Sequence, residues 1–234
     1  EALKAQAVLA RTYGYFHILK KKKLFDLGSD IHFQIFTNNV KKHDKIEKAV
    51  KSTRGLVATY EGYPIQIFYH STCGGRTEES QELWGRGFPY LHSVRCNSCK
   101  DSPRYSWNYT ILLERFVKVL NKKGGNFLHY ITDVKVVKRT DSGRIKELLF
   151  VNSDTDKKLK MSGKDFRMLM GPNKIKSLYI TGIELDGFHI IFRGRGFGHG
   201  VGMCQYGAMS MAKQGKSYIQ IINKYFNGTT LTKI

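Results

Sequence analysis

Two pairs of metal-binding side chains are spaced in a way that suits a zinc ion. Cys96 and Cys99 have the C-x2-C spacing of a zinc knuckle, and His70 and Cys73 could supply the other two ligands. Each pair lies at an expected turn. His92, four residues before Cys96, is the alternative to His70. A disulfide between Cys96 and Cys99, or between one of them and Cys73, is a second arrangement open to these thiols, because exported proteins meet oxidising conditions, and unpaired thiols are the third.

The acidic residues offer one candidate for glycosidic-bond chemistry and no convincing pair. Enzymes that hydrolyse such bonds usually place two carboxylates around the bond, but the clustered acids lie in a segment that we expect to be solvated: Glu78, Glu79 and Glu82. One acid suffices where the substrate supplies its own nucleophile. Glu1 could be that acid, on one helix face with Lys4 and Arg11. A glutamate that only stabilises the start of a helix through its dipole is the alternative.

A glycine-rich loop at residues 194–202 could display a side chain beside a groove. Its sequence, GRGFGHGVG, suggests phosphate binding, since glycines let the backbone approach a phosphate at a helix start. The match is poor, because no Gly-Lys-Ser/Thr follows and no acid stands about 20 residues on for a ribose. The loop instead holds His199 between two glycines, which suits a histidine beside a groove. A close-packed turn is the structural alternative.

Hydrophobic periodicity predicts an irregular mixture of helices and strands. Helices are expected at residues 1–19, 44–53, 108–122, 162–170, 204–214 and 218–225. Strands are expected at residues 31–36, 56–60, 65–69, 133–139, 145–152, 178–183 and 188–193. This order favours an α+β fold with mixed, largely antiparallel sheet regions and flanking helices. We expect a single compact catalytic unit with a substrate groove over residues 1–234, which could subdivide near 105–130.

The charge of the chain favours an anionic partner. Its 234 residues carry 39 Lys and Arg against 19 Asp and Glu, a net charge of +20, which would attract nucleic acid, an anionic membrane face or a cell-wall polymer. Nucleic acid is not expected, because no helix-turn-helix, RNP-type aromatic pair, zinc finger or RGG tract is present. No stretch has the roughly 18 apolar residues of a membrane span. Since Glu1 opens directly into a helical pattern, we expect any export signal or anchor to lie upstream of this sequence.

Three blocks of sequence resemble the stage II sporulation protein D family. They are EALKAQAVLARTY at residues 1–13, HSTCGGRT at 70–77 with PYLHSV at 89–94, and GFGHGVGMCQYGA at 196–208. The blocks occur in the family's order and span nearly the whole chain. Cys204 departs from the family motif, which typically has serine there; we expect it to be a small buried residue. The cysteines at 73, 96 and 99 recur only in some members, which implies a structural zinc site that the chemistry does not require.

The resemblance implies a lytic transglycosylase that cleaves the bond between N-acetylmuramic acid and N-acetylglucosamine in denuded peptidoglycan, leaving a 1,6-anhydro end. Glu1 matches the family's catalytic glutamate, and it would need contacts that raise its pKa. We expect Lys4 and Arg11 to bind substrate at some distance from Glu1. The remaining groove candidates are Ser71, Thr72, His199, Gln205 and Tyr206, with His70 lining the groove if it binds no metal.

The resemblance also implies partners and a location. A family member would act on glycan strands with a peptidoglycan amidase, stage II sporulation protein P, during engulfment of the forespore. It would work outside the cytoplasm, in the space between the mother-cell and forespore membranes, held by an anchor upstream of Glu1. The alternatives are a non-catalytic amidase enhancer or wall-binding module of the same fold and, on charge alone, a nucleic-acid-binding protein.

Overall fold

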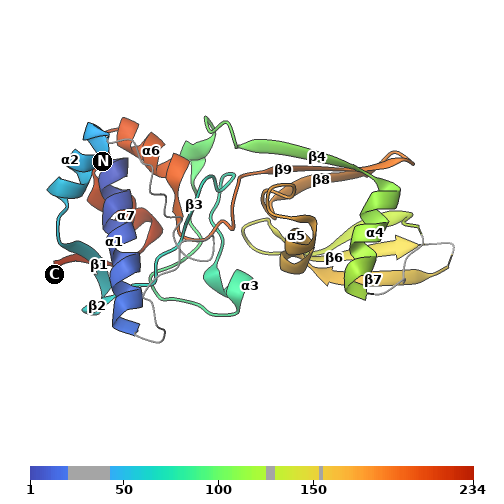
Figure 1. Cartoon of the computed structure of the whole chain (residues 1–234), viewed down its shortest axis with the longest axis horizontal. Helices are drawn as coiled ribbons and strands as arrows, with labels where there is room; N and C mark the ends of the chain where they lie inside the picture. The colour runs from blue at the N-terminus through green and yellow to red at the C-terminus, as the bar shows by residue number, and fades with distance from the viewer. Residues whose placement is uncertain (21–42, 125–129, 153–154) are drawn as a thin grey trace.

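The fold has two hydrophobic centres, one on each side of the molecule. The structure, a computed structural model, describes residues 1–20, 43–124, 130–152 and 155–234; the strand expected at 31–36 lies outside them. One cluster of buried residues runs from Ala5 to Cys99 and from Val201 to Phe226, and the other from Trp107 to Phe192. We call residues 1–105 with 196–234 the terminal lobe, and residues 106–195 the inserted lobe; they lie side by side in Figure 1. Whether the chain subdivides into independent domains remains a prediction.

The terminal lobe packs helices against short strands. Its helices are α1 (Ala2–Lys20), α2 (Asp44–Ser52), α3 (Ser80–Trp84), a 3-10 turn at Asn97–Cys99, α6 (Gln205–Lys213) and α7 (Tyr218–Tyr225). Its strands are β1 (Leu56–Tyr60), β2 (Tyr63–Pro64), β3 (Tyr69–His70), β10 (Met203–Cys204) and β11 (Thr230–Lys233). The antiparallel order is β11-β1-β2, while β10 and β3 form a short parallel pair. The two ends of the chain therefore meet in one lobe.

The inserted lobe combines two antiparallel sheets with two helices. Its elements are β4 (Ser106–Leu112), α4 (Leu113–Gly124), β5 (Asp133–Arg139), β6 (Ile145–Asn152), β7 (Lys157–Ser162), α5 (Gly163–Met170), β8 (Ile180–Leu185) and β9 (His189–Arg195). The sheets have the orders β4-β9-β8 and β5-β6-β7. Four phenylalanines with no exposed surface fill the centre: Phe116, Phe150, Phe166 and Phe192. No helix in the described ranges is long and apolar enough to cross a membrane.

These elements confirm the α+β fold class and most of the expected segments. Ser162 caps α5, since its hydroxyl accepts the backbone N–H of Asp165. The helix expected over residues 108–122 is wrong at its start, because β4 occupies Ser106–Leu112 and pairs with β9. Trp107 and Ile111 point inward from this strand, so its pattern there is that of a half-buried strand. The strand expected at 65–69 is also wrong, because the strand that pairs with β1 after the turn ends at Pro64 and the next strand, β3, begins only at Tyr69.

A buried polar joint connects the two lobes. Arg144, which follows the β5–β6 turn, donates to the carbonyl oxygens of Cys73 at 2.7 Å and Arg76 at 3.0 Å. Glu78 in the terminal lobe accepts hydrogen bonds from the hydroxyls of Thr140 at 2.7 Å and Ser142 at 2.9 Å. Glu78 is 4% exposed, so the expectation of a solvated acidic segment is wrong there. Its partners come from more than 60 residues away, which local sequence does not reveal.

Candidate functional site

Glu1 lies at the amino end of α1 with its carboxylate at the surface. Its Oε1 accepts a hydrogen bond from Lys4 Nζ at 2.6 Å, and its Oε2 accepts one from the backbone N–H of Tyr218 at 2.9 Å. The Lys4 contact, followed by the Tyr218 N–H, lowers the pKa of Glu1. The expectation that folded contacts raise this pKa is therefore wrong, because the carboxylate is held in its charged form at the surface.

The two basic residues expected near Glu1 have different roles in the structure. Lys4 contacts Glu1 directly, so the expected separation between them is wrong. Arg11 is turned away from Glu1: its Nη1 donates to the carbonyl oxygens of Thr53 at 2.7 Å and Leu56 at 2.8 Å. Arg11 thus ties α1 to the chain between α2 and β1.

A cavity of about 390 Å³ opens beside Glu1, between α1 and α2. Its lining residues are Glu1, Leu3, Lys4, Lys45, Lys48, Ala49 and Ser52. Among them Glu1 is the only carboxylate, and it faces three lysines. Such a cavity favours an anionic ligand and leaves a single acid in contact with it.

The glycine-rich loop is both a close-packed turn and the support of His199. Gly198 and Gly200 have φ of 118° and 87°, in the region that favours glycine. A Cβ at Gly198 would lie 2.7 Å from the Cβ of His70, and one at Gly200 would lie 2.5 Å from the Arg144 guanidinium. The loop therefore packs tightly on both lobes and turns His199 toward the space between them.

His199 and His70 are both held as neutral rings. His199 Nδ1 accepts the backbone N–H of Val201 at 3.1 Å, and its Nε2 lies 3.1 Å from the carbonyl oxygen of Tyr69. A proton on Nε2 alone satisfies both contacts. Burial lowers the pKa of His199 to about 4. His70 Nδ1 donates to the carbonyl oxygen of Val201 at 3.1 Å, its Nε2 has no partner, and burial lowers its pKa well below the usual value.

The other groove candidates fall into different environments. Thr72 is buried and its hydroxyl lies 2.8 Å from that of Ser102, so it is not exposed to a groove. Ser71 is half-buried, and its carbonyl oxygen accepts the backbone N–H of Tyr206 at 3.1 Å. Gln205 donates from Nε2 to Gln6 Oε1 at 3.2 Å, which places it against the early part of α1.

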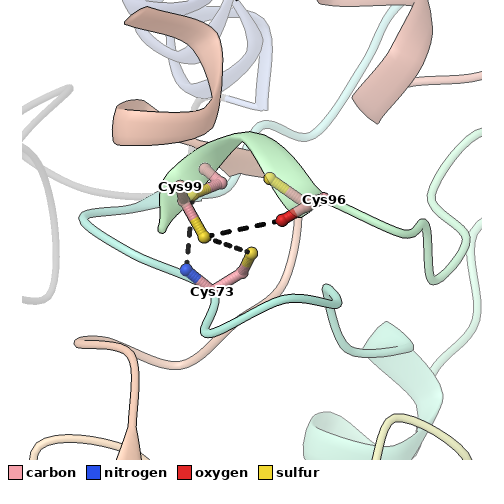
Figure 2. A group of neighbouring side chains, drawn as sticks. Cys73, Cys96 and Cys99 are labelled. Carbon is pink, nitrogen blue, oxygen red and sulfur yellow. Dashed lines mark hydrogen bonds between the residues drawn. The ribbon is translucent and has the colours of Figure 1, made fainter. Parts of the chain in front are cut away.

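Four buried cysteines form one cluster, and the fourth member is Cys204. The sulfurs of Cys73, Cys96, Cys99 and Cys204 all lie within 4.8 Å of one another, and all four thiols are free. Figure 2 shows three of these side chains pointing toward one another, with Cys73 Sγ 3.4 Å from Cys99 Sγ. The expected set of His70 with three cysteines is wrong in one position, because β10 pairs with β3 and brings Cys204 beside Cys73.

The surroundings of this cluster favour ionised sulfur at two of the four positions: the pKa values of Cys96 and Cys99 are lowered by contact with Cys204, while the pKa of Cys204 is raised by its neighbouring thiols and that of Cys73 is raised as well. Cys204 Sγ accepts the backbone N–H groups of Cys73 and Gly207, each at 3.3 Å, and Cys96 Sγ lies 3.2 Å from the Tyr225 hydroxyl. Gly207 is required here, since a Cβ would lie 2.5 Å from Cys96 Sγ. Four buried sulfurs with N–H donors are the donor set of a structural metal site.

A cleft lies between the lobes at His199. Two adjoining cavities of about 300 Å³ and 130 Å³ share Leu83, Lys164, Leu178 and His199 in their linings. Neither shares a lining residue with the cavity beside Glu1. The single groove expected from sequence is therefore divided into two places, one at Glu1 and one at His199.

Comparison with known proteins places the chain in a family. A profile described as stage II sporulation protein matches residues 1–60. Stage II sporulation protein D of Bacillus subtilis is 31% identical over 255 residues, which cover 100% of this chain and 69% of that protein. The chain belongs to the stage II sporulation protein D family. The match at residues 1–60 includes Glu1 and its helix.

Other relatives of this family member differ in their names and lengths. An uncharacterised protein of Brachyspira hyodysenteriae is 34% identical over 99% of this chain, which spans 61% of that protein. A Bacillus subtilis protein named amidase enhancer is 28% identical over 99% of this chain, which spans 38% of it. A profile described as a domain of unknown function, DUF8618, matches residues 90–202, a range that contains the inserted lobe.

Sequence reasoning missed three residues of this family member's sites. Trp84 ends α3 and forms a wall of the interlobe cleft, but the short helix has no strong periodic signal. Arg144 was missed because the carbonyl oxygens that bind its buried guanidinium belong to Cys73 and Arg76, which are far away in the sequence. Cys204 had a usable signal, because it is a cysteine where the family motif typically has serine and the chain has only four cysteines.

Proposed function

We propose that the protein is a peptidoglycan lytic transglycosylase that cleaves the β-1,4 bond between N-acetylmuramic acid and N-acetylglucosamine in glycan strands stripped of stem peptides. The observation that supports this most is the accessible Glu1 carboxylate beside a cavity in whose lining the described residues include no second carboxylate. A single acid matches a reaction in which the substrate supplies the nucleophile. Membership of the stage II sporulation protein D family agrees with a role at the cell wall.

Glu1 would act first as an acid and then as a base. Its protonated carboxyl donates to the glycosidic oxygen, so the bond to C1 of the muramyl sugar breaks and the N-acetylglucosamine leaves with a new hydroxyl. Positive charge develops at C1. The Glu1 carboxylate then takes the proton of the muramyl 6-hydroxyl as that oxygen bonds to C1 and closes the 1,6-anhydro ring. The proton lost in the first step is regained in the second.

Lys4 would have to leave Glu1 before the first step. The ion pair holds the carboxylate charged, whereas a general acid needs a proton near the working pH. Both side chains are about one-third exposed, so breaking the ion pair costs little free energy. A muramyl carboxylate entering the cavity would attract Lys4 away and leave Glu1 next to the sugar.

Mass spectrometry of denuded glycan strands incubated with the protein tests this proposal. We expect 1,6-anhydro-muramyl ends with the unaltered chain and none with Glu1→Gln. Glu47→Gln is a matched control, because Glu47 is a glutamate on α2 with a 45% exposed side chain and is not among the described lining residues of the cavity. Anhydro products that persist in Glu1→Gln would contradict the role of Glu1.

A non-catalytic amidase enhancer or wall-binding module is the second candidate. It is favoured by the lowered pKa of Glu1 and by the relative named amidase enhancer. In that case the protein would bind denuded strands without changing them, and it would increase the rate at which an amidase releases stem peptides. Unchanged strands together with a faster amidase reaction would favour this function over the first.

We propose further that the four cysteines hold a structural zinc ion. Tetrahedral zinc with sulfur at about 2.3 Å requires sulfurs about 3.8 Å apart, and the four sulfurs lie within 4.8 Å of one another. Zinc would tie β3, β10 and the Asn97–Cys99 turn together without entering the reaction. Metal analysis of the purified protein should give one zinc per chain. Cys204→Ser should lower this content, while His70→Gln should leave it unchanged.

A peptidoglycan amidase such as stage II sporulation protein P would be the partner, in the space between the mother-cell and forespore membranes. The same substrate supports this pairing, since an amidase produces the denuded strands that a transglycosylase of this type uses. An anchor upstream of Glu1 would keep the protein there. Mixing the two purified proteins with intact peptidoglycan should yield anhydro ends that neither protein produces alone; equal yields without the amidase would contradict the pairing.

A further inference from the structure

The interlobe cleft has an aromatic wall with a free face. The Trp84 ring stacks on Phe68 with centroids 4.4 Å apart and an interplanar angle of 27°, and it lies 5.5 Å from the ring of His199. Trp84 remains 38% exposed, so its other face is open to the cleft. Met168, 57% exposed on α5, lies across the same cavity. A fixed tryptophan with an open face is a platform for a flat, partly apolar ring.

On the opposite side of the cleft, the positive charges of Lys164 and Arg167 are not balanced by a carboxylate among the described residues. The three carboxylates in the described lining are already engaged: Glu82 with Lys146 at 2.6 Å, Glu147 with Lys160 at 2.9 Å, and Glu78 with the hydroxyls of Thr140 and Ser142. Lys164 is exposed on α5 and forms no ion pair among the described residues. Arg167 donates two nitrogens to the carbonyl oxygens of Ile175 and Lys176, which do not neutralise it.

We propose that this cleft binds a sugar ring that bears a carboxylate, with the ring on Trp84 and the carboxylate at Lys164 and Arg167. N-acetylmuramic acid in a denuded strand has this chemistry, and choosing it among carboxylated sugars rests on the proposed function. Ligand sites typically occupy about 300–1,000 Å³ with mostly apolar walls and few polar groups. Trp84, Lys164 and Arg167 line the smaller cavity, about 130 Å³, and the adjoining cavity of about 300 Å³ leaves space for the next sugar of the strand. Binding here would hold a strand by both lobes, away from Glu1.

Tryptophan fluorescence of the full chain reports on this site. The chain has two tryptophans, and Trp107 is 6% exposed, so a change on binding comes from Trp84. The probes are a denuded muramyl-containing tetrasaccharide and N-acetylglucosamine tetrasaccharide, which has no carboxylate. We expect saturable change with both and tighter binding of the muramyl probe. Lys164→Gln should lower the affinity for the muramyl probe by about threefold and leave the affinity for the N-acetylglucosamine probe unchanged.

Variants separate this site from Glu1. In calorimetry, Trp84→Ala should lower the affinity for both probes by roughly tenfold or more. Phe188→Ala, which removes a 78% exposed aromatic side chain elsewhere on the surface, should leave both affinities unchanged. Glu1→Gln should keep the fluorescence response. Loss of the response in Glu1→Gln, equal affinity for the two probes, or no response at all would overturn the inference. Binding through Trp84 without anhydro products would instead leave it standing and remove the proposed reaction.

Discussion

The cavity beside Glu1 and the cleft beside His199 are built in opposite ways. The first is bordered by two helices of one lobe, with an ion pair between residues three apart in sequence. The second needs both lobes, a buried joint and a glycine loop whose partners lie far away along the chain. The comparison teaches that a residue in a family motif, such as Glu1, can be identified from a local block of sequence, while a cleft assembled by the fold cannot.

Arg144→Met should separate the two sites most strongly. We expect it to lower the free energy of unfolding by about 3–5 kcal/mol, because the buried Glu78 would lose a nearby positive charge and the carbonyl oxygens of Cys73 and Arg76 would lose their donor. The interlobe cleft should be disturbed more than the cavity at Glu1. Urea denaturation measures the effect, with Arg193→Met as the control, since Arg193 forms an exposed pair with Glu184. A loss no larger than the control's would mean that the joint does not stabilise the fold.

Gly198→Ala should damage the cleft by distorting the loop beneath His199. The added Cβ would meet the Cβ of His70 at 2.7 Å on a backbone with φ of 118°, which we expect to cost about 2–3 kcal/mol of unfolding free energy. Gly187→Ala is the matched control, because its φ is 90° but nothing lies within 4 Å. Thermal unfolding of both should show the larger drop for Gly198. Equal drops would assign the cost to the backbone alone.

Acid should weaken the His199 region before the Glu1 region. The pKa of His199 is about 4 in the fold, below the roughly 6.5 of an unfolded histidine. The unfolded chain therefore binds more protons between these values, so stability present above pH 6.5 is lost as pH falls toward 4. We expect about 1–2 kcal/mol, less than the full shift because the ring is only half-buried.

The same pH series with His199→Gln supplies the control. Its denaturation curves should lose less stability over that interval than those of the unaltered chain. Parallel loss in both proteins would show that other groups, His70 among them, account for the acid sensitivity.

Among these substitutions, Lys4→Met should change the free energy of unfolding least, but it should change the pH dependence of strand cleavage. The exposed ion pair contributes about 0.5 kcal/mol or less to folding. Removing Lys4 deletes the largest influence that lowers the pKa of Glu1, so that pKa should rise. In a pH–rate profile of strand cleavage, the limb where the acid deprotonates should move to higher pH. A limb that stays in place would argue against Glu1 as the acid.

Elements with strong local signals were predictable. The patterns of α1, α2 and α7 and the β5–β6 hairpin give the expected segments within a few residues. The strand at Ser106–Leu112 was not predictable. Its aromatic and β-branched residues are compatible with either a strand or a helix, and only the pairing with β9 decides between them. The β1–β11 pairing joins residues more than 170 apart, a distance over which periodicity gives no information.

The candidate site was predictable to a similar degree. Three of the four cluster cysteines were found from their spacing, whereas Glu1 was assigned by family resemblance and its role stays a prediction. Cys204 joins them only through the β3–β10 pairing, and Glu78 is buried only through hydroxyls of the other lobe. The pKa of Glu1 was expected in the wrong direction because Tyr218, which supplies its second contact, is 217 residues away.

The β4–β9 pairing has a practical consequence. Ser106 and Arg195 face each other in register, so the inserted lobe enters and leaves the terminal lobe at one point. A single short turn could therefore join residues 105 and 196 after the lobe is cut out, and the excised piece would have its own two ends adjacent. In evolution the inserted lobe could therefore be exchanged without altering the helix that bears Glu1, so the proposed recognition of strands could change while the proposed reacting carboxylate stays in place.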